Sequence, residues 1–410
     1  MSKIKPTHIP MNQFPTIDGE LYIGDIPITQ LAARVGQTPF YAYDRKVIKE
    51  KVQLLRDTLP KEIHLHYAIK ANPMPAIVQY MSTLVDGFDL ASAGEMKIAL
   101  DTEMPRQHIS FAGPGKTDKE LTQAIAAEII INMESQNEME RISNIAEKLG
   151  LTPKVAIRVN PDFELKASGM KMSGGPKQFG IDAEHVPKTL KRLTELNLAF
   201  HGFHIFSGSQ NLNADSIIDA HNKTFELAYR LTEHAPTHPK LLNIGGGLGI
   251  PYFPGDTKID LQPIAKNLKN ILPSVKKNLP TTEIVMELGR YLVGEAGVYV
   301  CKIIDRKESR DETFLITDGG LHHHLAASGN FGQVIRKNYP VKMGRIRNEQ
   351  TETVNIVGPL CTPLDILANK MELPEAEIGD LVIVFQSGAY GYTASPEKFL
   401  SHPNTIEVLV

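Results

Sequence analysis

A lysine stands where an apolar, strand-like run gives way to a loop. Lys70 follows residues 64–69 (HLHYAI) and precedes residues 71–73 (ANP). A lysine in this place is anchored by rigid backbone and can still reach a ligand, and partial loss of water would favour its reactive neutral amine. Taken alone, such a lysine more often marks only the end of a strand. Imine chemistry at Lys70 therefore needs support from the rest of the chain.

Glycines, a carboxylate and an arginine supply that support. Gly245, Gly246 and Gly247 follow one apolar run, and Glu287 and Arg290 come at the end of the next. Glycines let backbone N–H groups close on an anion, and a guanidinium adds a bidentate charge. A phosphate site together with a reactive lysine indicates pyridoxal 5'-phosphate (PLP), whose aldehyde a lysine holds as a Schiff base. A carboxylate at Glu287 would keep the ring nitrogen of this cofactor protonated.

The elements that must position these groups follow a repeating pattern. Short apolar, β-branched runs alternate with amphipathic helical segments, which is typical of βα units around a parallel sheet. Eight strands are expected, at Ile63–Ile69, Gly87–Ala91, His108–Ala112, Ile129–Met133, Lys154–Val159, Phe200–Phe206, Lys240–Ile244 and Glu283–Glu287. They predict an α/β fold, a (β/α)8 TIM barrel, in which catalytic groups gather at the C-terminal ends of the strands.

The pattern changes after Gly297. Four strand-like runs follow with no long helix between them, at Val298–Ile304, Thr313–Ile316, Val354–Val357 and Leu381–Phe385. A second, mostly β domain is expected, and residues 22–27, which resemble a hairpin, place the N-terminal segment with it. We therefore expect a PLP-binding barrel at residues 38–297 and a C-terminal β domain of residues 298–410 joined by residues 1–37.

The composition limits the partners. The 410 residues carry a net charge of -3 with acidic and basic residues interspersed, so no nucleic-acid partner is expected. No apolar signal core opens the sequence, and no stretch approaches the roughly 20 apolar residues of a membrane span, which favours the cytoplasm and no membrane partner. Cys301 and Cys361 are the only cysteines and do not have the spacing of a metal or disulfide framework. A small-molecule substrate is the expectation.

The motifs together resemble the fold-type III PLP-dependent decarboxylases, the family of the ornithine, arginine and diaminopimelate enzymes. The resemblance covers nearly the whole length. It rests on residues 67–72 (YAIKAN), 245–247 (GGG), 287–290 (ELGR, with leucine in place of the family's proline), 358–361 (GPLC) and 387–390 (SGAY). It implies an alanine racemase-like barrel, PLP on Lys70, and a homodimer whose active sites are shared between two chains.

The resemblance also implies roles for single residues. Glu287 would pair with the ring nitrogen, and Arg158 would approach the ring hydroxyl. Cys361 would return a proton to the α-carbon after CO2 leaves, acting from the neighbouring subunit. The remaining cofactor contacts would come from Ser209, Gly245, Gly246, Gly247, Gly289, Arg290 and Tyr390.

Three positions depart from the family's pattern, and one of them is Gln178, which stands where the family has a lysine before phenylalanine and glycine. The family stacks a histidine, three residues before its serine, on the cofactor ring, and that position is Phe206 here, whose ring can still stack. His204 either takes this place or satisfies a hydrogen bond within the barrel. Thr362 follows Cys361 where the ornithine and diaminopimelate enzymes carry an acidic residue, and Asp365 comes three positions later. A neutral threonine removes the obvious partner of a second cationic amine.

Within the family the chain most resembles decarboxylases found alongside exosortase A systems, related to those that act on glutamate tethered to an acyl carrier protein. This resemblance rests on residues 170–172, 176–180, 319–324 and 361–365, of which residue 172 lies outside the part that the structure describes. Consecutive residues on a strand point to opposite faces, so the three histidines 322–324 are not expected to share a metal ion. We expect His322, with Thr362 and Asp365, near the substrate.

The expected reaction is the PLP-dependent α-decarboxylation of an amino acid, or of an aminoacyl group on a carrier protein, through a Schiff base on Lys70. Three alternatives stay open. The protein can be a decarboxylase of a free diamino acid of the diaminopimelate or ornithine type, an amino-acid racemase of the same fold, or a non-catalytic relative that binds PLP.

Overall fold

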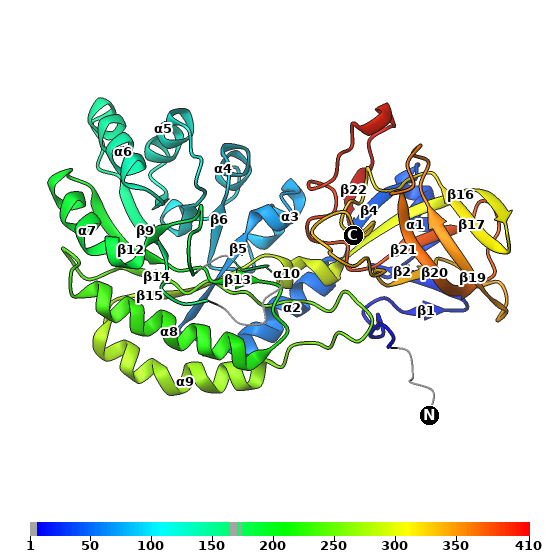
Figure 1. Ribbon diagram of the computed structural model, residues 1–410, viewed down its shortest axis with the longest axis horizontal. Helices are drawn as coiled ribbons and strands as arrows, with labels where there is room; N and C mark the ends of the chain where they lie inside the picture. Colours follow the sequence, from blue (N-terminus) through cyan, green and yellow to red (C-terminus); the bar gives the residue numbers. More distant parts are fainter. Residues whose placement is uncertain (1–5, 165–169, 172–173) are drawn as a thin grey trace. The chain divides into compact units, whose positions relative to one another are not determined.

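Eight parallel strands close into a barrel in the computed structural model, which describes residues 6–164, 170–171 and 174–410. The strands are β5 (Ile63–Ala68), β6 (Gly87–Leu90), β7 (Ile109–Phe111), β8 (Ile130–Met133), β9 (Lys154–Asn160), β12 (Ala199–His204), β14 (Leu241–Asn243) and β15 (Glu283–Leu288). Closure is complete because β9 pairs with both β8 and β12 while β15 pairs with β5. The expected (β/α)8 barrel is confirmed (Figure 1).

Amphipathic helices surround the strands, as Figure 1 shows. Their bounds are α3 (Pro75–Met81), α4 (Ala93–Leu100), α5 (Asp118–Ala126), α6 (Gln136–Leu149), α7 (Val186–Glu195), α8 (Ala214–Thr232) and α9 (Leu261–Asn278). Local chemistry fixes several ends: Thr117 and Glu120 form a capping box at the start of α5, and Gly150 ends α6 in the left-handed conformation. The expected alternation of strands with amphipathic helical segments is confirmed.

The barrel interior is layered. One buried apolar cluster consists of Ile130, Ala156, Leu241 and Val285, from four different strands. The residue two positions later in each of these strands is polar and buried, namely Asn132, Arg158, Asn243 and Glu287. Residues two apart lie on the same face of a strand. The sequence therefore builds an apolar layer and, directly toward the C-terminal ends of the strands, a polar one.

The chain divides into two compact units. The barrel unit consists of Val52–Ile250 and Lys258–Tyr291, and the β unit of Met1–Lys51, Pro251–Thr257 and Leu292–Val410. The boundary falls within α2 (Arg45–Thr58). This division differs from the expected boundaries at residues 38 and 297, mainly because β4 (Phe40–Tyr43) pairs with β16 (Gly297–Ser309) of the β unit.

The β unit is built on one large mixed sheet. Its strands run in the order β18 (Val341–Met343), β21 (Leu381–Val384), β16, β17 (Glu312–Thr317), β19 (Thr351–Val357) and β20 (Ile366–Pro374), with β4 paired to β16 and to β22 (Ile406–Leu409). A small sheet joins β1 (Thr16–Ile17), β2 (Glu20–Ile23) and β3 (Ile26–Pro27), followed by α1 (Ile28–Val35). The expected hairpin is confirmed by the pairing of Tyr22 with Pro27 and of Ile23 with Ile26.

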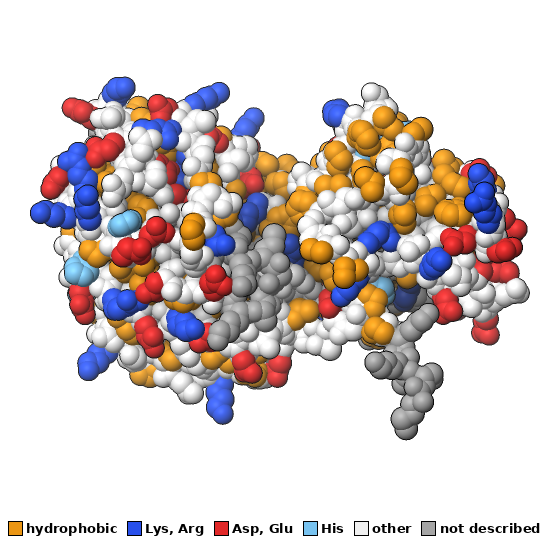
Figure 2. All heavy atoms as spheres, viewed as in Figure 1, with side chains coloured by type: hydrophobic (Ala, Val, Ile, Leu, Met, Phe, Trp, Pro, Cys, Tyr) orange, Lys and Arg blue, Asp and Glu red, His pale blue; other side chains and the backbone are white. Residues whose placement is uncertain are grey.

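Neither sign of charge dominates the face of the barrel unit that Figure 2 shows. Figure 2 shows basic and acidic side chains interspersed on the visible face of the barrel unit, in agreement with the small net charge of -3. None of the described helices has both the length and the apolar content that a bilayer crossing requires.

Candidate active site

Lys70 lies directly after the first barrel strand. β5 ends at Ala68, and the lysine follows in a short 3-10 turn (Ile69–Ala71). The turn is braced because the Tyr67 hydroxyl donates a hydrogen bond to the carbonyl of Asn72, at 2.8 Å. The Lys70 side chain is 41% exposed, although its neighbours Ile69 and Ala71 are buried. A rigid turn thus presents an accessible amine at the C-terminal end of the barrel.

Glu287 is the buried partner of this amine. Its Oε1 lies 3.4 Å from Nζ of Lys70, and its side chain is 4% exposed. Burial by itself would raise the pKa of Glu287, but Lys70, His204 and Arg158 together hold that pKa well below its usual value. The carboxylate is therefore ionised at neutral pH.

The glycine triplet follows β14, and its backbone conformation and close packing disfavour residues with a side chain. Gly245 and Gly247 have φ values of +68° and +73°, and a Cβ on Gly246 would lie 2.1 Å from the carbonyl oxygen of Glu287. Within the described part of the chain, the N–H groups of Gly246 and Gly247 make no hydrogen bond. Two unused backbone donors in a glycine loop suit an anion such as a phosphate.

The two candidates for the ring-stacking position occupy different places. Nζ of Lys70 lies 5.5 Å from the centroid of the Phe206 ring. His204 is 2% exposed, and its Nε2 lies 2.9 Å from Oε2 of Glu287. Phe206 is thus beside the reactive amine, and His204 satisfies a hydrogen bond inside the barrel.

Arg158 is fixed by a buried carboxylate. Its Nη1 donates to Oε1 of Glu134 at 2.8 Å, and its guanidinium lies 4.9 Å from the ring centroid of Phe179. Glu134 also accepts the backbone N–H groups of Gly113 and Gly180, at 2.5 and 3.2 Å. Although burial opposes it, the positive charge of Arg158 helps to lower the pKa of Glu134. One carboxylate therefore joins three loops and orients the arginine.

The last barrel strand leads back to the lysine turn. Gly289 follows β15 and precedes Arg290, the first residue of α10 (Arg290–Val293). A Cβ at Gly289 would lie 2.9 Å from the Cβ of Ala71, so glycine allows this loop to pack against the turn that carries Lys70. Ser209 lies in the short strand β13 (Gly208–Ser209), five residues after β12. The predicted cofactor residues of the barrel unit thus lie at the C-terminal ends of its strands or directly after them.

The other predicted site residues lie in the β unit. Cys361 is exposed in the turn between β19 and β20, and Thr362 is next to it. Asp365 is 3% exposed, and its two carboxylate oxygens accept the N–H groups of Leu321 and Leu360, at 2.5 and 2.9 Å. Both oxygens of Asp365 therefore hold backbone in place, including that of the turn with Cys361.

His322 is completely buried between two other imidazoles. Its ring centroid lies 3.7 Å from that of His323 and 5.1 Å from that of His402. Burial, together with these two histidines, lowers the pKa of His322 to about 3. The neighbouring rings turn to different partners, since Nε2 of His323 meets the carbonyl of Pro403 and Nε2 of His324 meets the Ser387 hydroxyl.

Tyr390 follows β21 in a turn with a left-handed backbone, at φ 54°. The turn needs glycine at position 388, because a Cβ there would lie 1.8 Å from the carbonyl oxygen of Val293. This close approach explains the glycine in the motif of residues 387–390.

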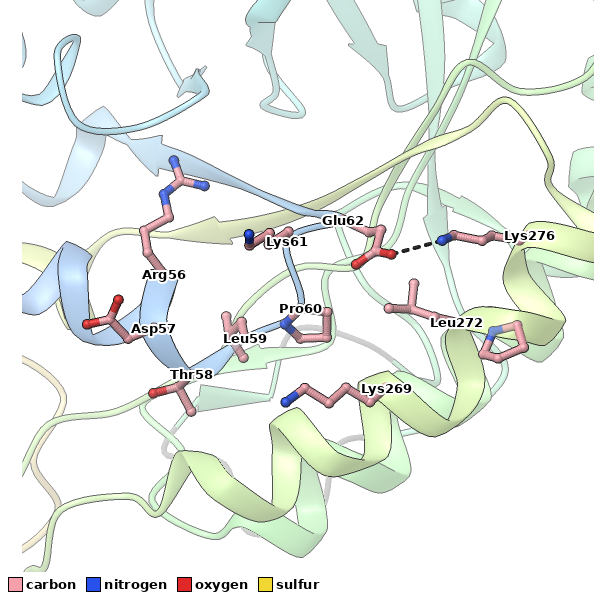
Figure 3. Close-up of a pocket in the computed structure, with 11 residues that line it drawn as sticks. Arg56, Asp57, Thr58, Leu59, Pro60, Lys61, Glu62, Lys269, Leu272 and Lys276 are labelled. Atoms are coloured by element: carbon pink, nitrogen blue, oxygen red, sulfur yellow. Dashed lines mark hydrogen bonds and ion pairs between the residues drawn. The ribbon is translucent and has the colours of Figure 1, made fainter.

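A groove of about 580 Å³ lies elsewhere on the barrel unit, where the chain enters β5. Figure 3 shows the ion pair between Glu62 and Lys276, at 2.8 Å, on its wall. Lys70 is at the other end of β5, so this groove is separate from the candidate active site.

One residue of the site was missed in the sequence. Glu134, directly after β8, stands at the end of a predicted strand, but no motif around it indicates its role. The missed residue is Asn243, the polar last residue of the otherwise apolar strand β14. Nδ2 of Asn243 donates to Oε2 of Glu287 at 3.3 Å, while its Oδ1 accepts the N–H of Gly245 at 2.8 Å. The only available signal was a polar side chain two residues before the glycine triplet.

This structure is typical of enzymes that use PLP: it is a barrel with a lysine, an ionised carboxylate and a glycine loop at the C-terminal ends of its strands. Residues 45–294 match the family model described as "Pyridoxal-dependent decarboxylase, pyridoxal binding domain". The chain belongs to this family and is a PLP-dependent decarboxylase.

Individual relatives agree with this assignment. The chain is 38% identical to the L-glutamyl-[BtrI acyl-carrier protein] decarboxylase of Niallia circulans, over 93% of this chain and 90% of that protein. It is 34% identical to the diaminopimelate decarboxylase of Aquifex aeolicus, over 96% and 91%. The structure of the diaminopimelate decarboxylase of M. jannaschii with L-lysine superposes with a TM-score of 0.87 at 28% identity, over 98% and 94%.

The residues present fit the cofactor of this family. The exposed amine of Lys70 suits its aldehyde, the ionised Glu287 suits a protonated ring nitrogen, and the two unused N–H groups of the glycine loop suit its phosphate.

Proposed function

We propose that this decarboxylase removes the α-carboxylate of a glutamyl group tethered to a carrier protein, in preference to that of a free diamino acid. The observation that carries the proposal is the state of Asp365, whose two oxygens are both used by backbone N–H groups. With the neutral Thr362 beside Cys361, this turn offers no carboxylate to a distal ammonium group. The 38% identical relative that acts on a carrier-linked L-glutamyl group supports this substrate class.

Each residue of the barrel unit then has a task. Bound PLP supplies the electron sink for the pair of electrons left when the bond to the carboxylate breaks. Lys70 would hold the aldehyde covalently until substrate replaces it, and Glu287 would keep a proton on the ring nitrogen. Phe206 would pack against the ring, and Arg158 would approach the ring hydroxyl. The phosphate would be bound by Ser209, Gly245, Gly246, Gly247, Gly289 and Arg290. The resemblance to the family adds Tyr390, a residue of the β unit, as a further predicted phosphate contact.

Cys361 would give a proton to the α-carbon after CO2 has left. The resemblance to the family implies that it acts in the site of a second copy of this chain, so a homodimer belongs to the proposal. Exposed apolar side chains near the Cys361 turn support such an interface: Val334, Ile335 and Leu364 are 100%, 77% and 58% exposed. Asn330 Nδ2 donates to the carbonyl of Leu364, which places these segments together. A cytoplasmic location stays a prediction.

The test is a comparison of substrates on the PLP-loaded protein. CO2 release is measured from a carrier-bound glutamyl thioester, free glutamate, diaminopimelate and ornithine. The proposal predicts release from the carrier-bound group at a kcat/KM at least about tenfold above that of any free amino acid. Faster release from a diamino acid would overturn the proposed substrate, and inversion of the α-carbon without CO2 would indicate a racemase.

A pair of variants tests the role of the Thr362 position. Thr362→Asp places a carboxylate where a distal ammonium would need one and should raise CO2 release from diamino acids. Thr362→Asn introduces a side chain of the same size as aspartate but without the charge, and it should not raise CO2 release from diamino acids. Equal behaviour of the two variants would show that this position does not select the substrate.

A further inference from the structure

We propose that His204 and Asn243 act as a clamp on one oxygen of Glu287, which keeps this carboxylate ionised and directs its other oxygen to the side of Lys70. The clamp is a property of the chain without its cofactor. Only the identity of what the second oxygen faces, the ring nitrogen of PLP, rests on the proposed function.

The two carboxylate oxygens of Glu287 contact different residues. Oε2 is approached by Nε2 of His204 at 2.9 Å and by Nδ2 of Asn243 at 3.3 Å. Oε1 lies 3.4 Å from Nζ of Lys70. Glu287 is 4% exposed, and the two clamp residues are each 2% exposed, so water does not compete for these bonds. The carboxylate is held on one side and available on the other.

The orientation of Asn243 is determined by a second bond. Its Oδ1 accepts the N–H of Gly245 at 2.8 Å, so its amide group must turn the N–H donors toward Glu287. The backbone N–H of Glu287 in turn donates to the carbonyl of Gly245, at 3.0 Å. Asn243 therefore couples the position of the carboxylate to the first glycine of the phosphate loop.

The environment of His204 determines which nitrogen carries the proton. Its Nδ1 is buried and has no hydrogen-bond partner in the described part of the chain. A proton there would be an unpaired buried donor, which is costly. We therefore place the proton of a neutral imidazole on Nε2, from which it donates to Oε2 of Glu287.

The clamp is the fixed part of the surroundings of Glu287. The charged or titratable groups that face it come from three elements: Lys70 after β5, Arg158 on β9 and His204 on β12. Lys70 is 41% exposed and must move when it reacts, whereas His204 and Asn243 are anchored within strands. The clamp thus preserves the ionised state of Glu287 when Lys70 is engaged elsewhere.

Substitutions at both clamp positions test the proposal on the protein with bound PLP. His204→Phe removes the N–H that donates to Glu287, whereas His204→Gln keeps an N–H donor on the side chain. Asn243→Asp keeps the size of the side chain but replaces its N–H donor with a second carboxylate oxygen facing Glu287. His204→Phe and Asn243→Asp should lower kcat near neutral pH by about 10- to 100-fold, the range of a lost hydrogen bond to a charged group. Both should move the acidic side of the pH profile of kcat to higher pH. His204→Gln should lose less of kcat than His204→Phe and shift the pH profile less, and the control His201→Gln on the same strand should match the wild type.

A second measurement uses the protein without PLP. With 15N-labelled histidine, several buried imidazole N–H groups should be protected from exchange with water, and one of these signals should vanish in His204→Gln and persist in His201→Gln. A wild-type pH profile in both His204→Phe and Asn243→Asp, or an unchanged set of protected imidazole signals in His204→Gln, would overturn the clamp. If the wild type releases no CO2 from any substrate, the proposed function fails, and the protected N–H still decides whether the clamp exists.

Discussion

Glu134 and Arg158 form a buried ion pair, with 2.8 Å between Oε1 and Nη1, and the two side chains are 2% and 8% exposed. The pKa of Glu134 is lowered on folding, so the pair stabilises the fold above the ordinary carboxyl pKa of about 4.5, and this contribution is lost as the pH falls through the lowered value. Glu134→Gln should decrease the free energy of unfolding at pH 7 by about 3–5 kcal/mol, because it leaves the arginine buried without its counterion.

Urea unfolding as a function of pH checks this prediction. The difference between wild type and Glu134→Gln should be constant from pH 7 to about pH 5 and shrink below the ordinary carboxyl pKa of about 4.5. Glu140→Gln, which breaks the exposed pair between Glu140 and Arg192, is the control and should change stability little. A difference of the same size for both variants would show that burial adds nothing to the Glu134 pair.

Lys70→Ala should abolish the covalent attachment of the cofactor and reduce CO2 release on the order of 10³-fold or more, since the amine that holds the aldehyde is gone. Borohydride reduction followed by mass spectrometry of the peptides locates the attachment. Lys61→Ala is a matched control, because Lys61 lies before β5, at the opposite end of the strand from Lys70. Cofactor retained on another lysine in Lys70→Ala would contradict the assignment.

Local patterns predicted the barrel because each of its strands and helices has its own periodicity. The strand β4 was missed for the opposite reason: its four buried residues, 40–43, pair with β16 and β22, which lie more than 250 residues further along the chain. In the site, too, residues with a local sequence pattern could be predicted, and contacts between separate strands could not. Lys70 and Glu287 could be found at strand ends, whereas the bond from Asn243 to Glu287 depends on the register of β14 against β15, which no local motif records.

Asp365→Asn should destabilise the β unit. The substitution turns one of two carboxylate oxygens into a donor that faces a backbone N–H, and leaving a buried donor unpaired costs about 1–3 kcal/mol. The free energy of unfolding measures the effect. Asp57→Asn, at an exposed residue of α2, should be neutral. A large change in KM for substrate with unchanged stability would instead show that Asp365 contacts the substrate.

The two cysteines should differ in both reactivity and function. Cys361 is exposed, whereas Cys301 is fully buried in β16, where burial raises the pKa of its thiol. Because the thiolate is the reactive form, a thiol reagent should modify one cysteine per native chain quickly and the second only after unfolding. Cys361→Ala should remove the fast reaction.

The same pair of residues tests the proton donor. Cys361→Ala should leave PLP binding intact and lower the yield of correctly protonated amine product, because no thiol can return a proton to the α-carbon. Cys301→Ala removes a buried thiol that the mechanism does not use, so the product should be that of the wild type. The check is the ratio of amine product to CO2, measured in deuterium oxide together with the configuration of the labelled carbon. An unchanged ratio and configuration in Cys361→Ala would assign the proton transfer to another group.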